Sequence, residues 1–320
     1  MKKIGLYSIL LILVVALAFG VVGCSGGNDT GSGTGDASGD AADEKKTPIT
    51  VSSKTFTESL LLGDMLIKYL EYHGYPVIDE TGLGETAIVR PALTSGEIDV
   101  YWEYTGTVLM FIMEHEPVFD SEESFRLVKE WDEKTNNIVW LDYAPVNNTY
   151  GIMVRKAFLD EHGFKNTSDM VEFIKNGGSV KFASFAEWTE RTDGLPSFES
   201  TYDFTWPRKD VLEIAMGLSY DALKNNQADA GIAFTTDGRI VAYDLPLLED
   251  DKNAFPVYNA APTFRKEIID TYPELPELVK ELSQLLDNDT LTKLNAAVDV
   301  DGKSISEVSE AFLKEKGLIQ

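Results

Sequence analysis

Hydrophobic and polar positions along the chain after residue 47 follow two different periods. The run PITVSS (48–53) alternates every second residue, as a half-buried strand does. The following TFTESLLLGDMLIKYLEYHG has apolar residues every three to four positions, which predicts an amphipathic helix. Thr55 and Glu58 fit a capping box at the start of this helix, and Gly74 is expected to end it.

Strand and helix patterns continue to alternate through the rest of the chain. Further predicted strands are YPVIDET, the aromatic segment VYWEY, NIVWL, YGIMVR, VKFASF and ADAGIAF. Predicted helices cover TAIVRPALTSG, residues 122–134, 168–175, 209–216 and 219–226, and the end of the chain. Strands interleaved with helices in this way favour an α/β fold.

The segment EIDVYWEYTGTVL (97–109) places three aromatic residues, Tyr101, Trp102 and Tyr104, just before a polar turn. Alternation of the side chains predicts a strand, and Tyr104 falls at its end. A side chain at that point can leave the sheet and meet a ligand. The alternative interpretation is an aromatic core strand followed by an ordinary turn.

Two distant segments, SGEIDVYWEYTGT and NNQADAGIAFTTD, align without a gap. Each has a helix end, an aspartate (Asp99, Asp229), a strand, an aromatic residue (Tyr104, Phe234) and a turn with threonine. The match predicts two similar lobes, each with an aromatic residue at the carboxyl edge of its sheet, where open α/β sheets bind ligands. Chance similarity between two helix–strand units is the alternative.

An apolar run at the N-terminus predicts a secretory signal over residues 1–23, because Lys2 and Lys3 precede it and it ends in VVGC. The ending resembles the bacterial lipobox, in which the cysteine, here Cys24, is lipidated and begins the mature chain. Residues 24–47 then form a flexible acidic tether at the outer face of the cytoplasmic membrane. A transmembrane anchor with an unmodified cysteine is the alternative.

Composition limits the partners but does not identify the ligand. At 320 residues the chain is long enough for two domains, each with a core. The formal net charge of −25 argues against nucleic acid and anionic lipid as partners. A solvated acidic surface has the same charge, so this number says little about the ligand. With one cysteine in the whole sequence, no disulfide is expected within the body.

Two segments resemble cofactor or metal motifs, and we expect neither to be one. TGLGETA fits G-x-G-x-x-A, but the match is weak in an exported chain, and we interpret it as a tight turn. VDVDGKSISEV resembles a calcium loop, yet with Gly302 in sixth place the first and twelfth ligands would be Ala297 and Val308. We therefore expect no cofactor and no metal. No motif of a catalytic nucleophile occurs, so we expect no enzyme activity.

Six segments, found in this order, carry a resemblance to a known family: SKTFTESLLLGDML, GLGETAIVRPALTSGEIDVYWEYTGT, VNNTYGIMVRK, ERTDGLPSF, FTTDGRIVAYDLPLLEDDKNAFPVYNAAP and LNAAVDVDGKS. Together they resemble the substrate-binding proteins of quaternary-amine ABC importers, the glycine betaine/choline/carnitine group. The resemblance implies an α/β, two-lobed periplasmic-binding-protein type II fold with a ligand cleft between the lobes. Residues 48–148 plus 237–320 would form lobe 1, and residues 149–236 lobe 2.

The resemblance also implies an aromatic cage around the ligand's trimethylammonium group. The matching positions are Tyr104, Tyr150, Phe234 and Tyr258. Aromatic faces suit a quaternary ammonium because this cation has no N–H to donate and is weakly hydrated. From the residues alone, Tyr150 could be an ordinary strand residue, and Tyr258 could pack a loop.

Lys54, Arg191 and Thr107 match positions that hold a betaine carboxylate in the family. Lysine and arginine can form charge-assisted hydrogen bonds to such a group. Both could instead be solvated surface charges, which is the usual fate of these residue types. We expect Glu103 and Asp237 to make contacts between the lobes or at the hinge.

Phe234 departs from the family pattern, in which tyrosine is common at this position. The ring face is kept, so a cation site is still expected, but the missing hydroxyl could change the preference among ligands. Choline-specific members tend to have an acidic side chain near the Thr107 position, so threonine favours a zwitterion such as glycine betaine.

We therefore expect an extracytoplasmic, lipid-anchored and monomeric solute-binding protein that delivers glycine betaine to an ABC permease for osmoprotection. Choline, carnitine or another trimethylammonium compound, such as a betainised histidine derivative, are alternative ligands. An exported α/β enzyme with an acid–base pair in the same cleft is a more distant alternative.

Overall fold

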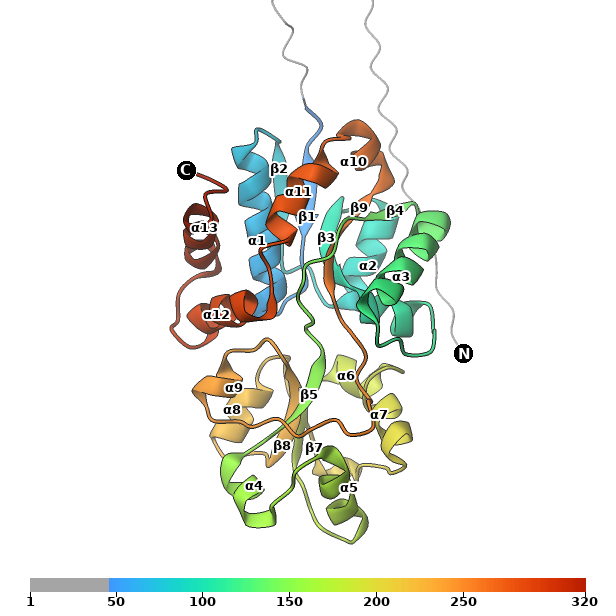
Figure 1. Cartoon of the computed structure of the whole chain (residues 1–320), viewed down its shortest axis with the longest axis vertical. Coiled ribbons are helices and arrows are strands. Elements are labelled where there is room, and N and C mark those ends of the chain that lie inside the picture. Colours follow the sequence, from blue (N-terminus) through green and yellow to red (C-terminus); the bar gives the residue numbers. More distant parts are fainter. Residues whose placement is uncertain (1–45) are drawn as a thin grey trace, which may run out of the picture. The chain divides into compact units, whose positions relative to one another are not determined.

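The computed structural model describes residues 46–320 (Figure 1). The expected signal, Cys24 and nearly all of the tether lie outside the described residues. Within the described part of the chain, no helix is both long enough and apolar enough to cross a bilayer. The same part contains no group of three or more potential ligand side chains arranged to hold a metal ion.

A five-stranded sheet forms the first lobe. Its strands are, in spatial order, β2 (Val77–Glu80), β1 (Ile49–Ser52), β3 (Val100–Tyr104), β9 (Ala260–Arg265) and β4 (Ile138–Trp140). Strand β1 pairs in parallel with β2 and β3, whereas β9 runs antiparallel to both β3 and β4. All five residues of β3 are buried, so the aromatic strand is the centre of this lobe.

A four-stranded sheet forms the second lobe. Its strands are, in spatial order, β5 (Tyr150–Val154), β8 (Ala230–Phe234), β6 (Phe182–Ser184) and β7 (Val211–Glu213). Strand β6 is parallel to β7 and β8, and β5 is antiparallel to β8. The order β7-β6-β8-β5 therefore has the same strand directions as β2-β1-β3-β9, which confirms the predicted similarity of the two lobes.

The two aspartates of the matching segments hold equivalent positions. Asp99, just before β3, accepts a hydrogen bond from a backbone N–H of β1 at 2.8 Å and pairs with Arg265 at 2.8 Å. Asp229, just before β8, accepts one from the backbone N–H that precedes β6 at 3.1 Å and pairs with Arg155 at 2.9 Å. Arg265 is the last residue of the antiparallel strand β9, and Arg155 directly follows the antiparallel strand β5, so each aspartate connects three neighbouring chain segments.

Helices connect the strands and cover the sheets. They are α1 (Thr57–Tyr72), α2 (Thr86–Ser95), α3 (Ser121–Asn136), α4 (Lys156–His162), α5 (Thr167–Lys175), α6 (Ala186–Glu190), α7 (Leu195–Tyr202), α8 (Ser219–Lys224), α9 (Arg239–Ala242), α10 (Lys266–Thr271), α11 (Leu275–Ser283), α12 (Asn288–Asp299) and α13 (Ile305–Glu315). A π-helical segment, Thr107–Ile112, follows β3.

The capping box predicted for α1 is wrong. Phe56 holds the N-cap position, and its side chain makes no capping hydrogen bond. The Thr55 hydroxyl instead donates to the carboxylate of Glu85 in the next loop. The Glu58 side chain points into the protein, where its carboxylate accepts hydrogen bonds from four polar side chains of other segments.

The helix predicted over residues 209–216 is also wrong. Residues Arg208–Asp210 form a single 3₁₀ turn, and β7 follows directly. Strand β7 pairs in parallel with β6, from Val211 opposite Phe182 to Glu213 opposite Ser184. Pairing along the edge of a sheet has overridden the local helical spacing, as strand propensity commonly depends on tertiary context.

Residues beyond 237, where the sequence placed the return to the first lobe, still contact β5. The N–H of Val154 donates to the carbonyl of Pro246, and the N–H of Leu248 donates to that of Ile152, both at 2.9 Å. Residues 246–248 thus lie along β5 in the second lobe. The return segment lies beside the outgoing one, since Asn148 and Tyr258 are joined by a backbone hydrogen bond of 3.0 Å.

Candidate functional site

One pocket contains all seven side chains that the sequence predicted for ligand binding. Its lining combines residues from both lobes. The predicted members are Lys54, Tyr104, Thr107, Tyr150, Arg191, Phe234 and Tyr258. The lining also includes residues that the sequence did not indicate, namely Phe56, Glu85, Thr86, Asn148, Glu187 and Met216.

Strand ends bring the aromatic residues together. Tyr104 is the last residue of β3, and Phe234 is the last residue of β8. Tyr150 begins β5 and lies directly opposite Phe234 in the antiparallel pairing. Tyr258 lies two residues before β9, which begins with Ala260 opposite Tyr104. The aromatic side chains thus gather at one end of each sheet.

Five aromatic rings form a continuous series in this pocket. Phe56 lies 6.0 Å from Tyr104 and stacks on Phe234, with ring centroids 5.2 Å apart and an interplanar angle of 16°. Phe234 lies 5.4 Å from Tyr150, which in turn lies 5.2 Å from Tyr258. Phe56 was not identified as a site residue from the sequence, although its position between the predicted ligand-binding residue Lys54 and the start of α1 could have indicated it.

The rings leave little open space between them. The free volume of the pocket is about 20 Å³, and a single water molecule needs about 10–15 Å³ on this scale. Phe56 and Phe234 occupy the position between the lobes by stacking on each other. A trimethylammonium group therefore requires these rings to separate before it can enter.

Lys54 is buried and forms an ion pair with Glu103, with Nζ 2.7 Å from Oε1. Burial opposes the ionisation of Glu103, but Lys54 and the Tyr101 hydroxyl outweigh it and lower the pKa of this carboxyl. Glu103 is thus a contact within the first lobe, and the expectation that it bridges the lobes is wrong. The ammonium group of Lys54 has three N–H bonds, so it can still donate to a ligand.

Arg191 is 6% exposed and is held by two carboxylates. Its Nε donates to Asp193 at 2.7 Å, one terminal nitrogen also pairs with Asp193, and the other donates to Glu187 at 3.3 Å. Burial lowers the pKa of Arg191, but Tyr150 and Asp193 raise it well above its usual range, so the group is a cation. A guanidinium has five N–H bonds, and two therefore remain for a ligand oxygen.

Hydroxyl groups of two pocket tyrosines donate to buried carboxylates. The Tyr104 hydroxyl lies 2.7 Å from Oε1 of Glu58, and the Tyr258 hydroxyl lies 3.1 Å from Oδ2 of Asp193. These bonds fix the planes of both rings. Thr107 is buried in the first turn after β3 and completes this side of the pocket.

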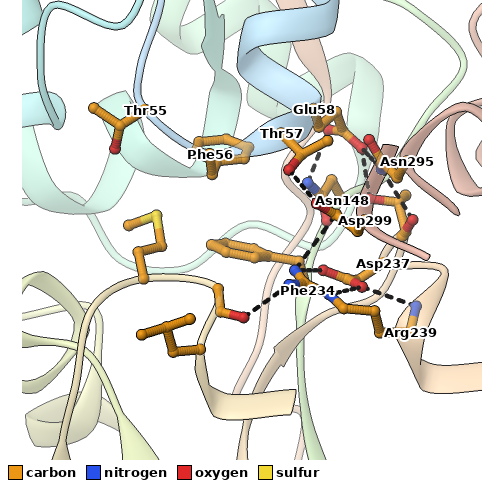
Figure 2. Close-up of a pocket in the computed structure, with 14 residues that line it drawn as sticks. Thr55, Phe56, Thr57, Glu58, Asn148, Phe234, Asp237, Arg239, Asn295 and Asp299 are labelled. Atoms are coloured by element: carbon orange, nitrogen blue, oxygen red, sulfur yellow. Dashed lines mark hydrogen bonds and ion pairs between the residues drawn. The ribbon is translucent and has the colours of Figure 1, made fainter. Parts of the chain in front are cut away.

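A second pocket adjoins the first and shares Phe56, Asn148, Met216 and Phe234 with it (Figure 2). Its volume is about 210 Å³, and Glu58 lies in its wall. Here Arg239 pairs with Asp237 at 2.6 Å and reaches Asp299, at the end of α12, at 3.5 Å. Asp237 therefore takes part in the contact between the lobes indirectly, because Arg239 bridges it to Asp299.

Residues 47–315 match the family model described as the substrate-binding domain of the ABC-type glycine betaine transport system. The glycine betaine-binding protein YehZ of Escherichia coli is 34% identical over 278 residues, covering 85% of this chain and 91% of that protein. A glycine-betaine-binding protein of Pseudomonas aeruginosa is 36% identical over 277 residues, covering 85% of this chain and 88% of that protein.

The solved structures similar to this chain include a crystal structure described as a glycine betaine/carnitine/choline ABC transporter. It superposes with a TM-score of 0.69 at 28% identity and covers 86% of this chain and 100% of that one. The two-lobed α/β fold predicted from the sequence is confirmed by this similarity.

Proposed function

Because this chain belongs to the family of substrate-binding domains of ABC-type glycine betaine transport systems, we propose that it captures glycine betaine and delivers it to a membrane permease. The observation that carries the proposal is the series of five aromatic rings beside two buried cations. Rings attract a quaternary ammonium at about 0.5–2 kcal/mol per favourable contact. The cations can bind the carboxylate at the other end of a betaine.

The site residues take two roles in this proposal. Tyr104, Tyr150, Phe234 and Tyr258 enclose the trimethylammonium group, and Phe56 joins them as a fifth ring. Lys54, Arg191 and Thr107 bind the carboxylate. Since the rings touch in this conformation, the ligand enters when the lobes move apart and is enclosed when they close.

Titration calorimetry of the purified full-length protein in detergent tests this function. We expect glycine betaine to bind with a dissociation constant in the micromolar range, about −8 kcal/mol, and proline to bind at least 100-fold more weakly. Choline and carnitine are included to rank the other trimethylammonium ligands. Absence of binding for all three quaternary amines would contradict the proposal.

An exported enzyme that uses the same cleft is the competing function, and one observation separates the two. A binding protein releases its ligand chemically unchanged. Glycine betaine recovered from the titration is therefore expected to have the same mass and the same proton spectrum as before. Conversion of the ligand during a long incubation would favour the enzyme.

We propose further that Cys24 is lipidated, which places the body, as a monomer, at the outer face of the cytoplasmic membrane. The signal sequence and the polar segment after Cys24 support this. Intact mass measurement should show a chain that begins at Cys24 and carries a diacylglyceryl group, and Cys24→Ser should lack it. A chain that retains residues 1–23 with an unmodified cysteine would instead be a transmembrane-anchored form.

A further inference from the structure

Glu58 differs from the other buried carboxylates of the described residues. The others each pair with an arginine or lysine side chain, in the pairs Asp99–Arg265, Glu103–Lys54, Asp132–Arg90, Asp193–Arg191 and Asp237–Arg239. Glu58 is 2% exposed, and no lysine, arginine or histidine of residues 46–320 lies within ion-pair distance of it. A buried carboxylate without a cation is costly, since burial removes the charge from water.

Four neutral groups donate to this carboxylate, two on each oxygen. Figure 2 shows Glu58 with two of them, Asn148 and Asn295. Oε1 accepts from the Tyr104 hydroxyl at 2.7 Å and from the Asn148 amide at 2.8 Å. Oε2 accepts from the Thr236 hydroxyl at 2.6 Å and from the Asn295 amide at 3.1 Å. Amide N–H groups can only donate, so this arrangement suits an ionised carboxylate. The hydrogen bonds stabilise the charge but do not neutralise it.

Among residues 46–320, the surroundings of Glu58 supply further hydrogen-bond acceptors and no unpaired cation. Because Asn148 and Asn295 turn their amide nitrogens toward Glu58, their amide oxygens are buried with no hydrogen-bond partner among the described residues. Burial is the largest influence on Glu58 and raises its pKa despite the four hydrogen bonds. The start of α1 contributes only a fraction of a positive charge.

Glu58 also lies directly behind the ligand pocket. Its oxygen holds the hydroxyl of Tyr104, a pocket ring, and its neighbour Asn148 lines the pocket itself. The basic side chains that line the two pockets are each paired with another carboxylate: Lys54 with Glu103, Arg191 with Asp193 and Arg239 with Asp237. The charge of Glu58 is thus left without a partner at the place where the proposed function puts a cation.

We propose that Glu58 is the counter-charge of the bound quaternary ammonium. The ligand's cation completes an ion pair that the protein leaves open, acting across the ring of Tyr104 in a region screened little by water. This inference rests on the proposed function and adds a residue that distinguishes charged ligands from uncharged ones of the same shape. It also explains why so buried a pocket can bind a cation. The charge of Glu58 is unbalanced in the free protein, and the ligand's ammonium group balances it in the complex.

The test compares two ligands of the same shape, glycine betaine and 3,3-dimethylbutanoate, in which carbon replaces the charged nitrogen. Their dissociation constants are measured by calorimetry and displacement on full-length wild-type protein, Glu58→Gln and Tyr104→Phe. We expect Glu58→Gln to weaken glycine betaine about 10- to 100-fold, and the isostere less than threefold, because only the betaine loses an ion pair. Tyr104→Phe keeps the charge and the ring, and should weaken glycine betaine less than fivefold.

Several results would overturn the inference. If Glu58→Gln weakens both ligands equally, or if Tyr104→Phe costs as much as Glu58→Gln, Glu58 only positions the tyrosine. Glu85→Gln tests whether any nearby negative charge has the same effect, because Glu85 lines the ligand pocket itself but is partly exposed. An equal loss of affinity in that variant would also count against Glu58.

Two further measurements separate the remaining possibilities. Should Glu58→Gln fail to fold, the two ligands are compared on wild type, and a glycine betaine affinity within about threefold of that of the isostere contradicts the inference. If wild type binds no quaternary amine, the proposed function itself is contradicted. If wild type binds glycine betaine and Glu58→Gln leaves the affinity ratio of betaine to isostere unchanged, only the inference about Glu58 is contradicted.

Discussion

Replacing Arg191 with alanine should weaken glycine betaine binding about 100-fold or more. The variant removes two free N–H donors, and a hydrogen bond to a charged group contributes about 1.5–3 kcal/mol. Each 1.4 kcal/mol is a factor of about ten in the dissociation constant. Choline has no carboxylate, so its affinity should fall less than tenfold in the same variant. Titration calorimetry with both ligands measures the difference.

Folding must be separated from binding in this experiment, because loss of Arg191 leaves Asp193 buried without a cation. The double variant Arg191→Gln/Asp193→Asn removes both charges and is expected to show the same selective loss of betaine. Arg155→Ala is the matched control, since Arg155 pairs with Asp229 in the same lobe and does not line the pocket. Equal losses for betaine and choline would show that Arg191 does not bind the carboxylate.

Replacing Phe234 with alanine should weaken both ligands about 10- to 100-fold. Phe234 is the central ring of the series, in contact with Phe56 and Tyr150, so its removal opens the cage on two sides. The loss combines one cation–π contact of about 0.5–2 kcal/mol with lost apolar contact around the methyl groups. Because the trimethylammonium group is common to betaine and choline, both affinities should fall by similar factors.

Two variants complete this test. Phe234→Tyr keeps the ring face and should bind within about threefold of wild type. Phe158→Ala is the control for general loss of packing, because Phe158 is a buried ring of the same lobe that packs on Phe164 and Phe173 away from the pocket. Both alanine variants should lower the free energy of unfolding by about 3–5 kcal/mol. If Phe158→Ala weakens ligand binding as much as Phe234→Ala, the effect is one of stability.

The pocket residues could be named from the sequence because strand ends and family motifs are local features. Tyr104 and Phe234 each close a strand that alternation alone predicts, and the two segments align without a gap. Phe56 lies in a family motif two residues after Lys54, but an aromatic residue before a helix is usually interpreted as packing. Only its stacking on Phe234, from the other lobe, identifies it as part of the site.

The same contrast explains the errors. Glu58 stands at the right spacing from Thr55 for a capping box, and local rules can predict nothing else for it. Its actual partners lie at residues 104, 148, 236 and 295, which only the folded chain brings together. Residues 209–216 have helical spacing, but β6 offers backbone hydrogen bonds to residues 211–213, and local spacing cannot predict this pairing.

The sequence by itself therefore determined the class of fold, the two matching strands, the family and most of the pocket aromatics, because each rests on periodicity or on contiguous motifs. Tertiary structure alone decided which later segment lies along β5, which basic residues are already paired, and which buried carboxylate of the described residues is left without a cation. These properties depend on burial and on contacts between distant residues. Burial turns a charge from a solvated group into one that requires a partner, and here that requirement singles out Glu58.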